Sequence, residues 1–427
     1  MSSSGTKVLQ HASGGGGARG TISEALYRTL GGVPIGFDAY DGSSAGPLDA
    51  DVRITVVRER ALHYLVGSRN ELGLARAFVA GDLEVKGDLH ALLLLLTGDG
   101  IGEVPLADRL AALRDLGLHT LRPVEPPAEE VRLHGWRHSR RRDSTAVSHH
   151  YDVSNRFYRW VLGESMTYTC AVFPTEDSTL EQAQAAKYDL VARKLGLAPG
   201  MRLLDVGCGW GGMVIHAAST YGVQALGVTL SRQQAEFGQR RIAELGLGGL
   251  AEVRHLDYRD APTQEYDAIS SIGLTEHIGQ RELPAYFGRL YARLRPGGRL
   301  LNHCITRPTT TQRIKAVGFI PRYVFPDGEL MGVGAIASVM QNAGFELRHL
   351  EDLREHYALT LARWCANLDA HWDDALAEVG PNRARVWALY MAGSQVGFER
   401  NHIQLHQVLG VKPHVSGAAD YPLRAAW

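Results

Sequence analysis

The chain has 427 residues, of which 45 are lysine or arginine and 46 are aspartate or glutamate; at roughly 150 residues for each domain, this length predicts about two domains. The net charge of -1 excludes a general attraction to polyanions, so an anionic partner must be bound by a local group of basic residues. The four cysteines are scattered without a C-x-x-C pair, which argues against a disulfide framework or a structural zinc site and fits a reducing cytosol.

The N-terminal part of the chain divides into two segments. Residues 1–20 are rich in serine and glycine, cannot bury apolar surface and are expected to be disordered. Residues 21–130 are expected to form a smaller α+β domain, in which Val52–Val57 alternates like a strand and Glu71–Leu96 carries a helical apolar period with interruptions at Gly81 and Gly87. A helix over Leu106–Leu118 and a proline-rich stretch then lead into the second domain. We expect the smaller domain either to associate with lipid or membrane or to mediate homo-oligomerisation.

Two features bear on the membrane. The longest apolar run, Ala91–Leu96, is far shorter than the ~20 residues that cross a bilayer, and no signal peptide opens the sequence. The segment Arg132–Arg142 gathers basic residues around Trp136, which is typical either of a solvated face or of contact with anionic head groups. Nucleic-acid binding would need further basic clusters, and the sequence has none. We therefore expect a cytoplasmic protein that associates peripherally with the inner face of the membrane.

Residues 131–427 show an alternation of strands and helices. This alternation predicts an α/β fold with a mostly parallel sheet and helices on both faces, in which ligands bind at the carboxyl ends of the strands. The expected elements are the helix Leu180–Leu195, the strand Met201–Val206, a helix from Met213, the strand Val223–Val228, the helix Ser231–Leu245, the strands Ala251–Leu256 and Tyr266–Gly273, the helix Arg281–Leu294 and the strand Arg299–Ile305.

A glycine-rich turn, within Leu203–Gly212, follows the first of these strands. Its glycines allow the backbone to turn sharply and to approach a ligand. Asp205, just before the turn, can meet a positively charged group. The next strand ends in Thr229-Leu230-Ser231, without the acid that a dinucleotide fold places there for the ribose. The pocket therefore suits S-adenosylmethionine better than NAD.

Further candidates lie at other strand ends. Asp257 can accept from the exocyclic amino group of an adenine, and Tyr258 can stack on the purine. Glu276 lies among apolar residues and is either a functional acid or a surface carboxylate, whereas a histidine on a strand, such as His303, is most often a satisfied core residue. The pair His149-His150 lacks carboxylate or thiolate ligands at fixed spacing, so no metal site is expected.

Several segments, taken together, carry a resemblance to a known family. They are His150-Tyr151-Asp152-Val153-Ser154-Asn155, Met166-Thr167-Tyr168-Thr169-Cys170, Leu204–Gly212, Glu276-His277-Ile278-Gly279 and Tyr323–Leu330. From about His149 to Val408 the chain resembles the cyclopropane-fatty-acid synthase family, which consists of S-adenosylmethionine-dependent methyltransferases with a Rossmann-like fold that act on unsaturated acyl chains. The segments Tyr40–Pro47, Gly273–His277 and Asn302–Ile305 are most similar to the branch that forms 10-methylene or 10-methyl branched fatty acids of the tuberculostearic acid type.

The resemblance implies two sets of site residues. The cofactor contacts fall on Tyr168, Thr169, Asp205, Gly207, Cys208, Gly209, Trp210, Gly211, Thr229, Leu230, Gln234, Asp257, Tyr258 and Arg259. A bound bicarbonate or carbonate ion falls on Glu276, His303 and Tyr323 and on backbone groups of Cys170 and Ile305. Ser394 stands where many relatives have a cysteine, which excludes a thiol nucleophile at that position.

The resemblance also implies a reaction. The methyl group of S-adenosylmethionine would add to the double bond of an oleoyl-type phospholipid chain, and bicarbonate-assisted proton loss from the resulting carbocation would leave a 10-methylene branch. Proton loss from the new methyl group would instead close a cyclopropane ring. A dry pocket with the rings of Tyr168, Phe157, Tyr323 and Trp364 would protect the cation. A flavin- or nicotinamide-dependent reductase is the expected partner for a methyl product. A nucleic-acid methyltransferase and an inactive lipid-binding module are the alternatives from other classes.

Overall fold

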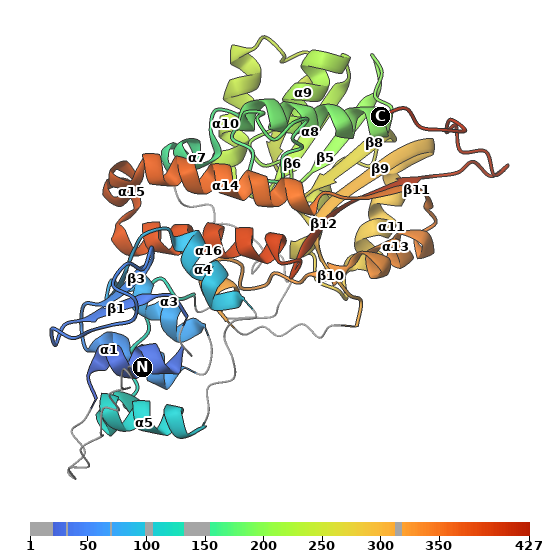
Figure 1. The fold of residues 1–427 in the computed structure, drawn as a ribbon. Coiled ribbons are helices and arrows are strands. Elements are labelled where there is room, and N and C mark those ends of the chain that lie inside the picture. The colour runs from blue at the N-terminus through green and yellow to red at the C-terminus, as the bar shows by residue number, and fades with distance from the viewer. Residues whose placement is uncertain (1–19, 31–32, 69–70, 99–105, 132–153, 312–317) are drawn as a thin grey trace, which may run out of the picture.

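An eight-stranded sheet organises the larger part of the chain (Figure 1). The computed structural model describes residues 20–427 except 31–32, 69–70, 99–105, 132–153 and 312–317. In space the strands follow the order β11-β12-β9-β8-β5-β6-β7, and β10 pairs with β9. They are β5 (Arg202–Val206), β6 (Gln224–Thr229), β7 (Ala251–His255), β8 (Tyr266–Ile272), β9 (Leu294–Arg307), β10 (Met331–Gly332), β11 (Glu346–Asp352) and β12 (Gln404–Val411). Strands β5 to β9 run parallel, whereas β12 is antiparallel to both of its neighbours.

The central strands are buried on both faces. Leu203 and Leu204 on adjacent positions of β5 are both wholly buried, as is typical of parallel strands. Helices α8 (Leu180–Leu195), α9 (Gly212–Tyr221) and α10 (Arg232–Glu244) cover one face, and α11 (Leu283–Arg293) and α13 (Val333–Asn342) cover the other. Because helices cover both faces, a ligand can reach such a sheet only at its strand ends. In folds of this kind the binding site lies at the carboxyl ends of the strands.

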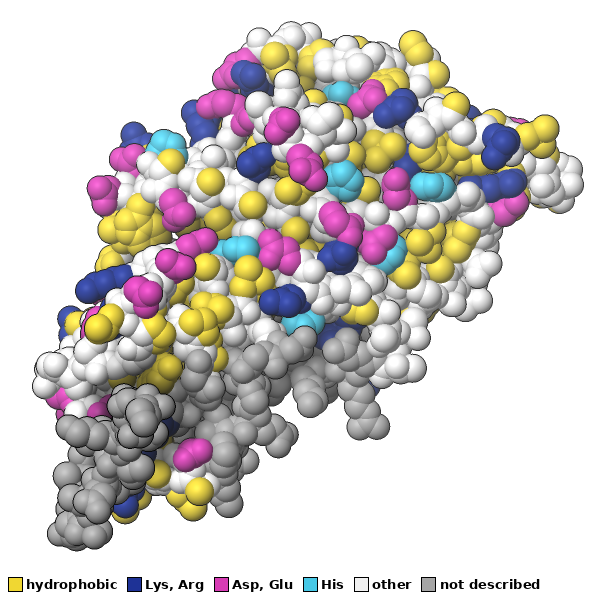
Figure 2. Space-filling model, in the orientation of Figure 1, with side chains coloured by type: hydrophobic (Ala, Val, Ile, Leu, Met, Phe, Trp, Pro, Cys, Tyr) yellow, Lys and Arg dark blue, Asp and Glu magenta, His cyan; other side chains and the backbone are white. Residues whose placement is uncertain are grey.

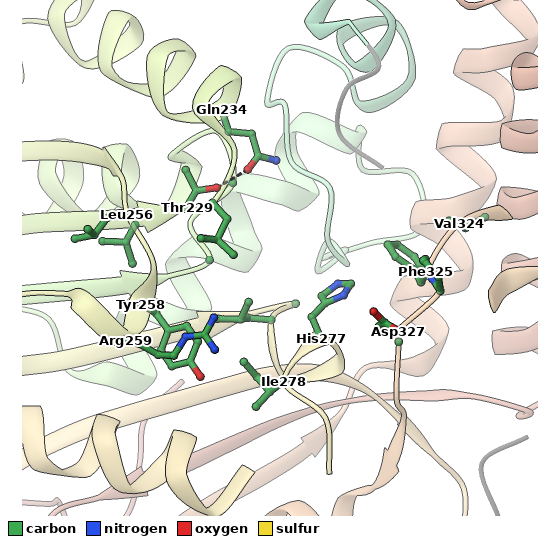
Figure 3. A pocket seen from close by; sticks show the side chains of 18 residues that line it. Thr229, Gln234, Leu256, Tyr258, Arg259, His277, Ile278, Val324, Phe325 and Asp327 are labelled. Atoms are coloured by element: carbon green, nitrogen blue, oxygen red, sulfur yellow. Dashed lines mark hydrogen bonds between the residues drawn. The ribbon is translucent and has the colours of Figure 1, made fainter. Parts of the chain in front are cut away.

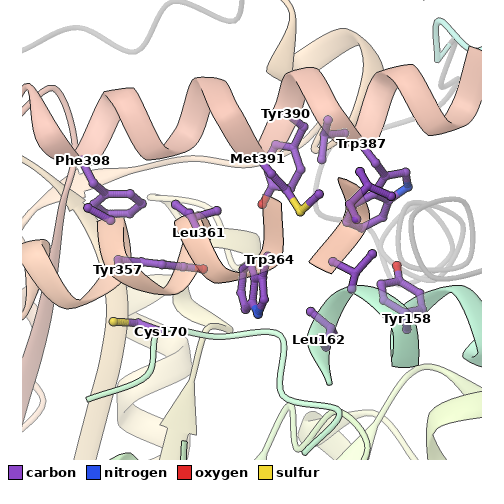
Figure 4. Close-up of a cluster of buried hydrophobic side chains, with 14 of the residues drawn as sticks. Tyr158, Leu162, Cys170, Tyr357, Leu361, Trp364, Trp387, Tyr390, Met391 and Phe398 are labelled. Carbon is purple, nitrogen blue, oxygen red and sulfur yellow. The ribbon is translucent and has the colours of Figure 1, made fainter. Parts of the chain in front are cut away.

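A helical layer rich in aromatic residues packs beside that edge. It consists of α7 (Asn155–Leu162), α14 (Arg354–Ala370), α15 (Trp372–Val379) and α16 (Pro381–Glu399). Figure 4 shows side chains of α14 meeting side chains of α16, and the rings of Tyr357 and Phe398 stack with centroids 4.4 Å apart. Trp364 is wholly buried in this cluster.

The N-terminal residues form a smaller α+β unit around a four-stranded sheet of order β2-β1-β3-β4. Its strands are β1 (Gly36–Ala39), β2 (Ser44–Ala45), β3 (Arg53–Val56) and β4 (Leu83–Lys86), and its helices are α1 (Ile22–Thr29), α2 (Arg60–Gly67), α3 (Leu72–Val79), α4 (Leu89–Thr97) and α5 (Leu106–Leu116). Helix α4 packs against α16, and α3 adds Leu72 and Val79 to the aromatic cluster (Figure 1). The two units therefore share buried surface. Short elements complete the chain, namely η1 (Leu118–Leu121), η2 (Tyr258–Asp260), η3 (Thr275–His277) and α12 (Ile320–Tyr323).

The predicted α/β fold with a mostly parallel sheet is confirmed, and each predicted element of that sheet has a counterpart in the structure. The interruptions predicted at Gly81 and Gly87 within Glu71–Leu96 are confirmed, but the prediction did not include the strand β4 that lies between them and separates α3 from α4. Gly81 and Gly87 flank this strand with φ angles of 68° and 97°, which a continuous right-handed helix does not allow. Pairing with β3 and burial of Leu83 stabilise the strand instead.

Charged side chains of both signs are intermixed on the face of the molecule shown in Figure 2. Among the described residues, no helix is both long enough and apolar enough to cross a bilayer. The basic segment Arg132–Arg142 lies outside the described residues.

Candidate active site

The glycine-rich turn between β5 and α9 exposes its backbone to open space. Gly207 and Gly209 adopt left-handed φ angles of 74° and 54°. The backbone N–H groups of Gly207 and Cys208 both donate to the carbonyl of Val228 at 3.0 Å, which ties the turn to β6. A Cβ atom at Gly209 would meet nothing within 4 Å. The turn therefore leaves room for a ligand against its backbone.

A first cavity, the strand-end cavity, lies where β6, β7 and β8 end (Figure 3). It has a volume of about 120 Å³. Thr229 and Gln234 lie on one side, with the Thr229 hydroxyl donating to Gln234 Oε1 at 2.7 Å, and Tyr258 and Arg259 lie below them. Among the predicted cofactor residues, Gly207, Gly209, Thr229, Leu230, Gln234, Tyr258 and Arg259 line this cavity.

Asp257 does not line the strand-end cavity, and its carboxylate accepts from the side chain of Arg259 at 2.8 and 2.6 Å. Asp257 was predicted to accept from the amino group of an adenine. That amino group would have to compete with Arg259 for the carboxylate. Arg259 instead places its own side chain on the cavity wall.

A second cavity, the glycine-loop cavity, adjoins the first because Gly207, Gly209, Gln234 and Gly273 line both. It also has Tyr168, Thr169, Asp205, Cys208 and Trp210 on its wall, whereas the predicted Gly211 lines neither cavity. Asp205 accepts from the Ser270 hydroxyl at 2.6 Å, and burial raises the pKa of Asp205 to about 6. The Trp210 indole N–H donates to Asn155 at 2.9 Å, which fixes this wall to α7.

A third cavity, the apolar cavity, lies between the sheet edge and α14 and α16. Its volume is about 300 Å³, and it shares Tyr168, Thr169 and Gly273 with the glycine-loop cavity. The other walls include Glu276, Ile305, Ile320, Leu330, Tyr357, Leu361, Tyr390, Ser394 and Phe398. A hydrocarbon chain in this cavity would thus lie beside a ligand held at the glycine-rich turn.

Glu276 is the acid of the apolar cavity. Its Oε1 accepts from the backbone N–H of Ile305 at 2.7 Å, and its Oε2 is buried without a hydrogen-bond partner among the described residues. Burial raises the pKa of Glu276 to about 7. Such a carboxyl group can exchange a proton near neutral pH, as a general acid or base must.

His303 is held in a defined tautomer on β9. Lys194 has only donors and donates to Gln407 Oε1 at 2.7 Å, so the Gln407 amide N–H₂ faces His303 Nδ1 at 3.2 Å. Nδ1 therefore accepts, and Nε2 carries the hydrogen. This Nε2 is buried and, within the described part of the chain, has no partner. Burial lowers the pKa of His303 well below its ordinary value, so the ring is neutral.

Two other predicted anion ligands, Cys170 and Tyr323, do not line the apolar cavity. The Cys170 thiol is wholly buried and donates to the carbonyl of Ala171 at 3.1 Å, and burial raises its pKa far above the ordinary value. The phenol of Tyr323 donates to Glu130 at 3.4 Å and does not line the apolar cavity. Tyr357 on α14 does line it, together with Glu276 and Ile305.

The predicted aromatic lining of the dry pocket is only partly correct. Tyr168 lines the apolar cavity, but Phe157 and Trp364 are wholly buried in the aromatic cluster behind it. The Trp364 ring contacts the Tyr168 ring with centroids 5.4 Å apart. Sequence reasoning missed Tyr357, Tyr390 and Phe398, which come from α14 and α16 and belong to no local motif. The predicted motif residues His150 to Val153 lie outside the described residues.

Comparisons with known proteins agree with this geometry. A family model described as mycolic acid cyclopropane synthetase matches residues 138–408. The chain is 52% identical over 413 residues to a probable fatty acid methyltransferase of Mycobacterium tuberculosis, covering 94% of this chain and 96% of that protein. It is 32% identical to the tuberculostearic acid methyltransferase UfaA1 of the same organism, covering 90% of this chain and 88% of the relative.

Two solved structures show the same fold over the catalytic part. The cyclopropane synthase MmaA2 from Mycobacterium tuberculosis has a TM-score of 0.60 at 34% identity, covering 62% of this chain and 98% of that one. The mycolic acid cyclopropane synthase CmaA1, complexed with SAH and CTAB, has a TM-score of 0.60 at 33% identity, covering 62% and 97%. The chain therefore belongs to the mycolic acid cyclopropane synthetase family and is an S-adenosylmethionine-dependent fatty-acyl methyltransferase.

Proposed function

We propose that the protein methylates the double bond of an oleoyl-type phospholipid acyl chain and releases a 10-methylene branched chain. The observation that carries the proposal is the junction of the glycine-loop cavity with the apolar cavity at Tyr168, Thr169 and Gly273, with Glu276 on the apolar side. A bound cofactor would supply an electrophilic methyl group at this junction. The residues of the chain then have to hold the alkene in line with it and keep water away.

The cavity walls suit both tasks. Ile305, Leu330 and Leu361 give an apolar surface for a hydrocarbon, and the rings of Tyr168 and Tyr390 present faces that stabilise positive charge. As the π electrons of the alkene bond to the methyl carbon, the methyl–sulfur bond would break and its electron pair would stay on sulfur, so that S-adenosylhomocysteine would leave and the second alkene carbon would become a cation. A 1,2-hydride shift from the methylated carbon to the cationic carbon, followed by loss of a proton from the new methyl group, then gives the methylene branch. Loss of a methyl proton without the hydride shift closes a cyclopropane ring instead.

We also propose that a bicarbonate ion is held by two buried polar atoms that lack partners among the described residues. Glu276 lines the apolar cavity, whereas His303 does not. His303 Nε2 is a donor without an acceptor, and Glu276 Oε2 faces no donor. Bicarbonate carries both acceptor oxygens and one O–H donor, so it would satisfy both groups and would accept the proton from the substrate. Glu276 and His303 would hold the ion. Tyr357, which shares the apolar cavity with Glu276, is a better candidate for the phenol in this set than Tyr323.

The relatives support a branched product and leave a cyclopropane as the second candidate. UfaA1, which is named a tuberculostearic acid methyltransferase, aligns with 90% of this chain, whereas the named cyclopropane synthase structures cover 62%. A methylene product would require a separate reductase to become a methyl branch. The reductase, the membrane contact of Arg132–Arg142, and the lipid-binding or oligomerising role of residues 21–130 stay predictions.

The test uses Glu276→Gln with S-adenosylmethionine and vesicles of oleoyl phospholipid. Loss of the carboxylate that would position the bicarbonate base should lower turnover by roughly two to four orders of magnitude. The exposed Glu282→Gln serves as the matched control and should retain turnover. NMR of the recovered lipid separates the products, because a methylene branch gives a vinylidene signal and a cyclopropane does not. Near-normal turnover in Glu276→Gln would reject the role of Glu276, and absence of labelled methyl in lipid with the unaltered protein would reject the function.

A further inference from the structure

Lys187 on α8 is a buried lysine at the wall of the glycine-loop cavity. The side chain is 0% exposed, lines the glycine-loop cavity and belongs to the core-facing side of the helix. Its Nζ donates to the Thr169 hydroxyl at 3.1 Å and lies 3.8 Å from the centroid of the Tyr188 ring. Over the described ranges, no carboxylate lies within ion-pair distance of this nitrogen.

A second lysine of the same helix shows what Lys187 lacks. Lys194, two turns further along, is also wholly buried, but it forms an ion pair with Glu351 and donates to Gln407 at 2.7 Å. The protein thus provides a carboxylate for one buried lysine of α8 and none for the other. An unpaired buried lysine is driven towards its neutral form, so a negatively charged ligand group in this cavity would be needed to hold Lys187 in its charged form.

The cavity in front of Lys187 also contains an acid. Asp205 lies on the same wall, at the end of β5 and beside the glycine-rich turn. Burial lowers the pKa of Lys187 to about 7 and raises the pKa of Asp205 to about 6, and the attraction between the two groups opposes both shifts only in part. One cavity therefore holds a lysine and an aspartate in a dry environment, and the carboxylate and ammonium ends of an amino acid zwitterion would each stabilise the charged form of one of them.

We propose that Lys187 binds the carboxylate of the methionyl part of the cofactor and that Asp205 faces its ammonium group. Lys187 is then a positioning residue: by fixing the methionyl end at the glycine-loop cavity, it orients the sulfonium methyl group towards the apolar cavity through the shared wall at Thr169. The proposal rests on the cofactor dependence of the family and holds for either lipid product.

The experiment measures binding in the absence of lipid, by calorimetry on the full chain. The probes are S-adenosylhomocysteine and its decarboxylated analogue, which keeps the amine and lacks the carboxylate. The unaltered protein should bind the decarboxylated analogue about 10- to 100-fold more weakly, as expected for a lost charge-assisted hydrogen bond. The substitution Lys187→Met should weaken S-adenosylhomocysteine binding by a similar factor. The variant protein should then bind the two probes with equal affinity.

Lys194→Met is the matched control, because it removes a buried lysine from the same helix face outside the cavity. It should keep the preference for the carboxylate-bearing probe. Equal binding of both probes by the unaltered protein, or an equal loss for both probes in Lys187→Met, would overturn the proposal. Lys187→Gln gives the same comparison should the Met variant fail to fold. Binding of the probes without methylation of oleoyl lipid would reject the proposed function and leave this inference intact.

Discussion

The Glu276 carboxyl group is held in surroundings that favour its neutral form, at a cost to the stability of the fold. Burial raises its pKa from 4.5 to about 7, whereas the unfolded chain returns it to the ordinary value. Between these two pH values the folded state binds more protons than the unfolded state, so stability falls as pH rises through this window and stays low above it. Proteins accept such losses at functional positions.

The first prediction follows from this sign. Glu276→Gln keeps an acceptor for the Ile305 N–H and cannot ionise, so it should be more stable than the unaltered protein by roughly 3 kcal/mol at pH 8, with the advantage vanishing near pH 4.5. Denaturant unfolding at a series of pH values measures it. The exposed Glu282→Gln should show no such trend. If Glu276→Gln and the unaltered protein were equally stable at pH 8, the fold would not raise the pKa of this carboxyl group.

Residues of local motifs could be predicted from the sequence, and residues brought together by the fold could not. Asp205, Gly207 and Thr229 lie next to one another in a strand-turn-helix pattern, and all three line the cofactor cavities. Tyr357 joins Glu276 only because α14 packs over the sheet edge, and the periodicity of that helix gives no sign of it.

At the scale of elements, the glycine-rich turn combines backbone strain with open space. Gly209 has a φ of 54° and Gly200, in the turn before β5, has a φ of 83°; a Cβ at either position would meet nothing within 4 Å. The two sites differ in that only Gly209 lines the cofactor cavities. Alanine substitutions at Gly209 and Gly200 therefore form a matched pair. Both introduce backbone strain, but only the one at Gly209 places a methyl group in the ligand space.

We therefore predict that Gly209→Ala and Gly200→Ala each lower stability by about 1 kcal/mol, because alanine disfavours left-handed backbone. Only Gly209→Ala should weaken binding of S-adenosylhomocysteine, since its methyl group enters the ligand space. Thermal denaturation and calorimetry measure the two effects. Equal binding by both variants would mean that the ligand does not approach the turn at Gly209.

Element prediction succeeded within the strand–helix alternation of residues 201–305 and missed β12, although seven of its eight residues are buried. The strands β5 to β8 are short apolar runs between helices of clear period, and their positions agree with prediction to within one or two residues. The strand β4 has only Leu83 buried among four residues, so the helical period of its neighbours on either side concealed it. Strand β11, which alternates between half-buried and exposed positions at the sheet edge, was likewise not predicted.

At the scale of the whole molecule, a buried acid connects the N-terminal unit to the wall of the apolar cavity. Glu130 accepts from Arg76 of α3 at 2.8 Å through both oxygens, and from Arg322 of α12 at 2.7 Å. Helix α12 also contributes Ile320 and Pro321 to the apolar cavity. The sequence could not predict this connection, because 192 residues separate Glu130 from Arg322.

Glu130→Gln should therefore lower stability by roughly 1–3 kcal/mol and raise the KM for lipid, while cofactor binding stays unchanged. The neighbouring Glu129→Gln, which loses only a 3.3 Å hydrogen bond from Asn382, is the control and should change neither quantity appreciably. Denaturant unfolding and lipid titration of turnover measure the two effects. If Glu130→Gln lowered stability without changing the KM for lipid, the ion pairs of Glu130 would not influence the lipid-binding cavity.

The position of β12 has a consequence for biosynthesis. This strand, residues Gln404–Val411, is the last in the chain, yet it lies between β9 and β11 and supplies the Gln407 amide that sets the imidazole of His303. A nascent chain emerging from the ribosome can complete β5 to β8 early, but the edge of β9 waits unpaired until the final strand leaves the exit tunnel. Acquisition of catalytic competence should therefore wait until β12 has been synthesised and has paired with β9.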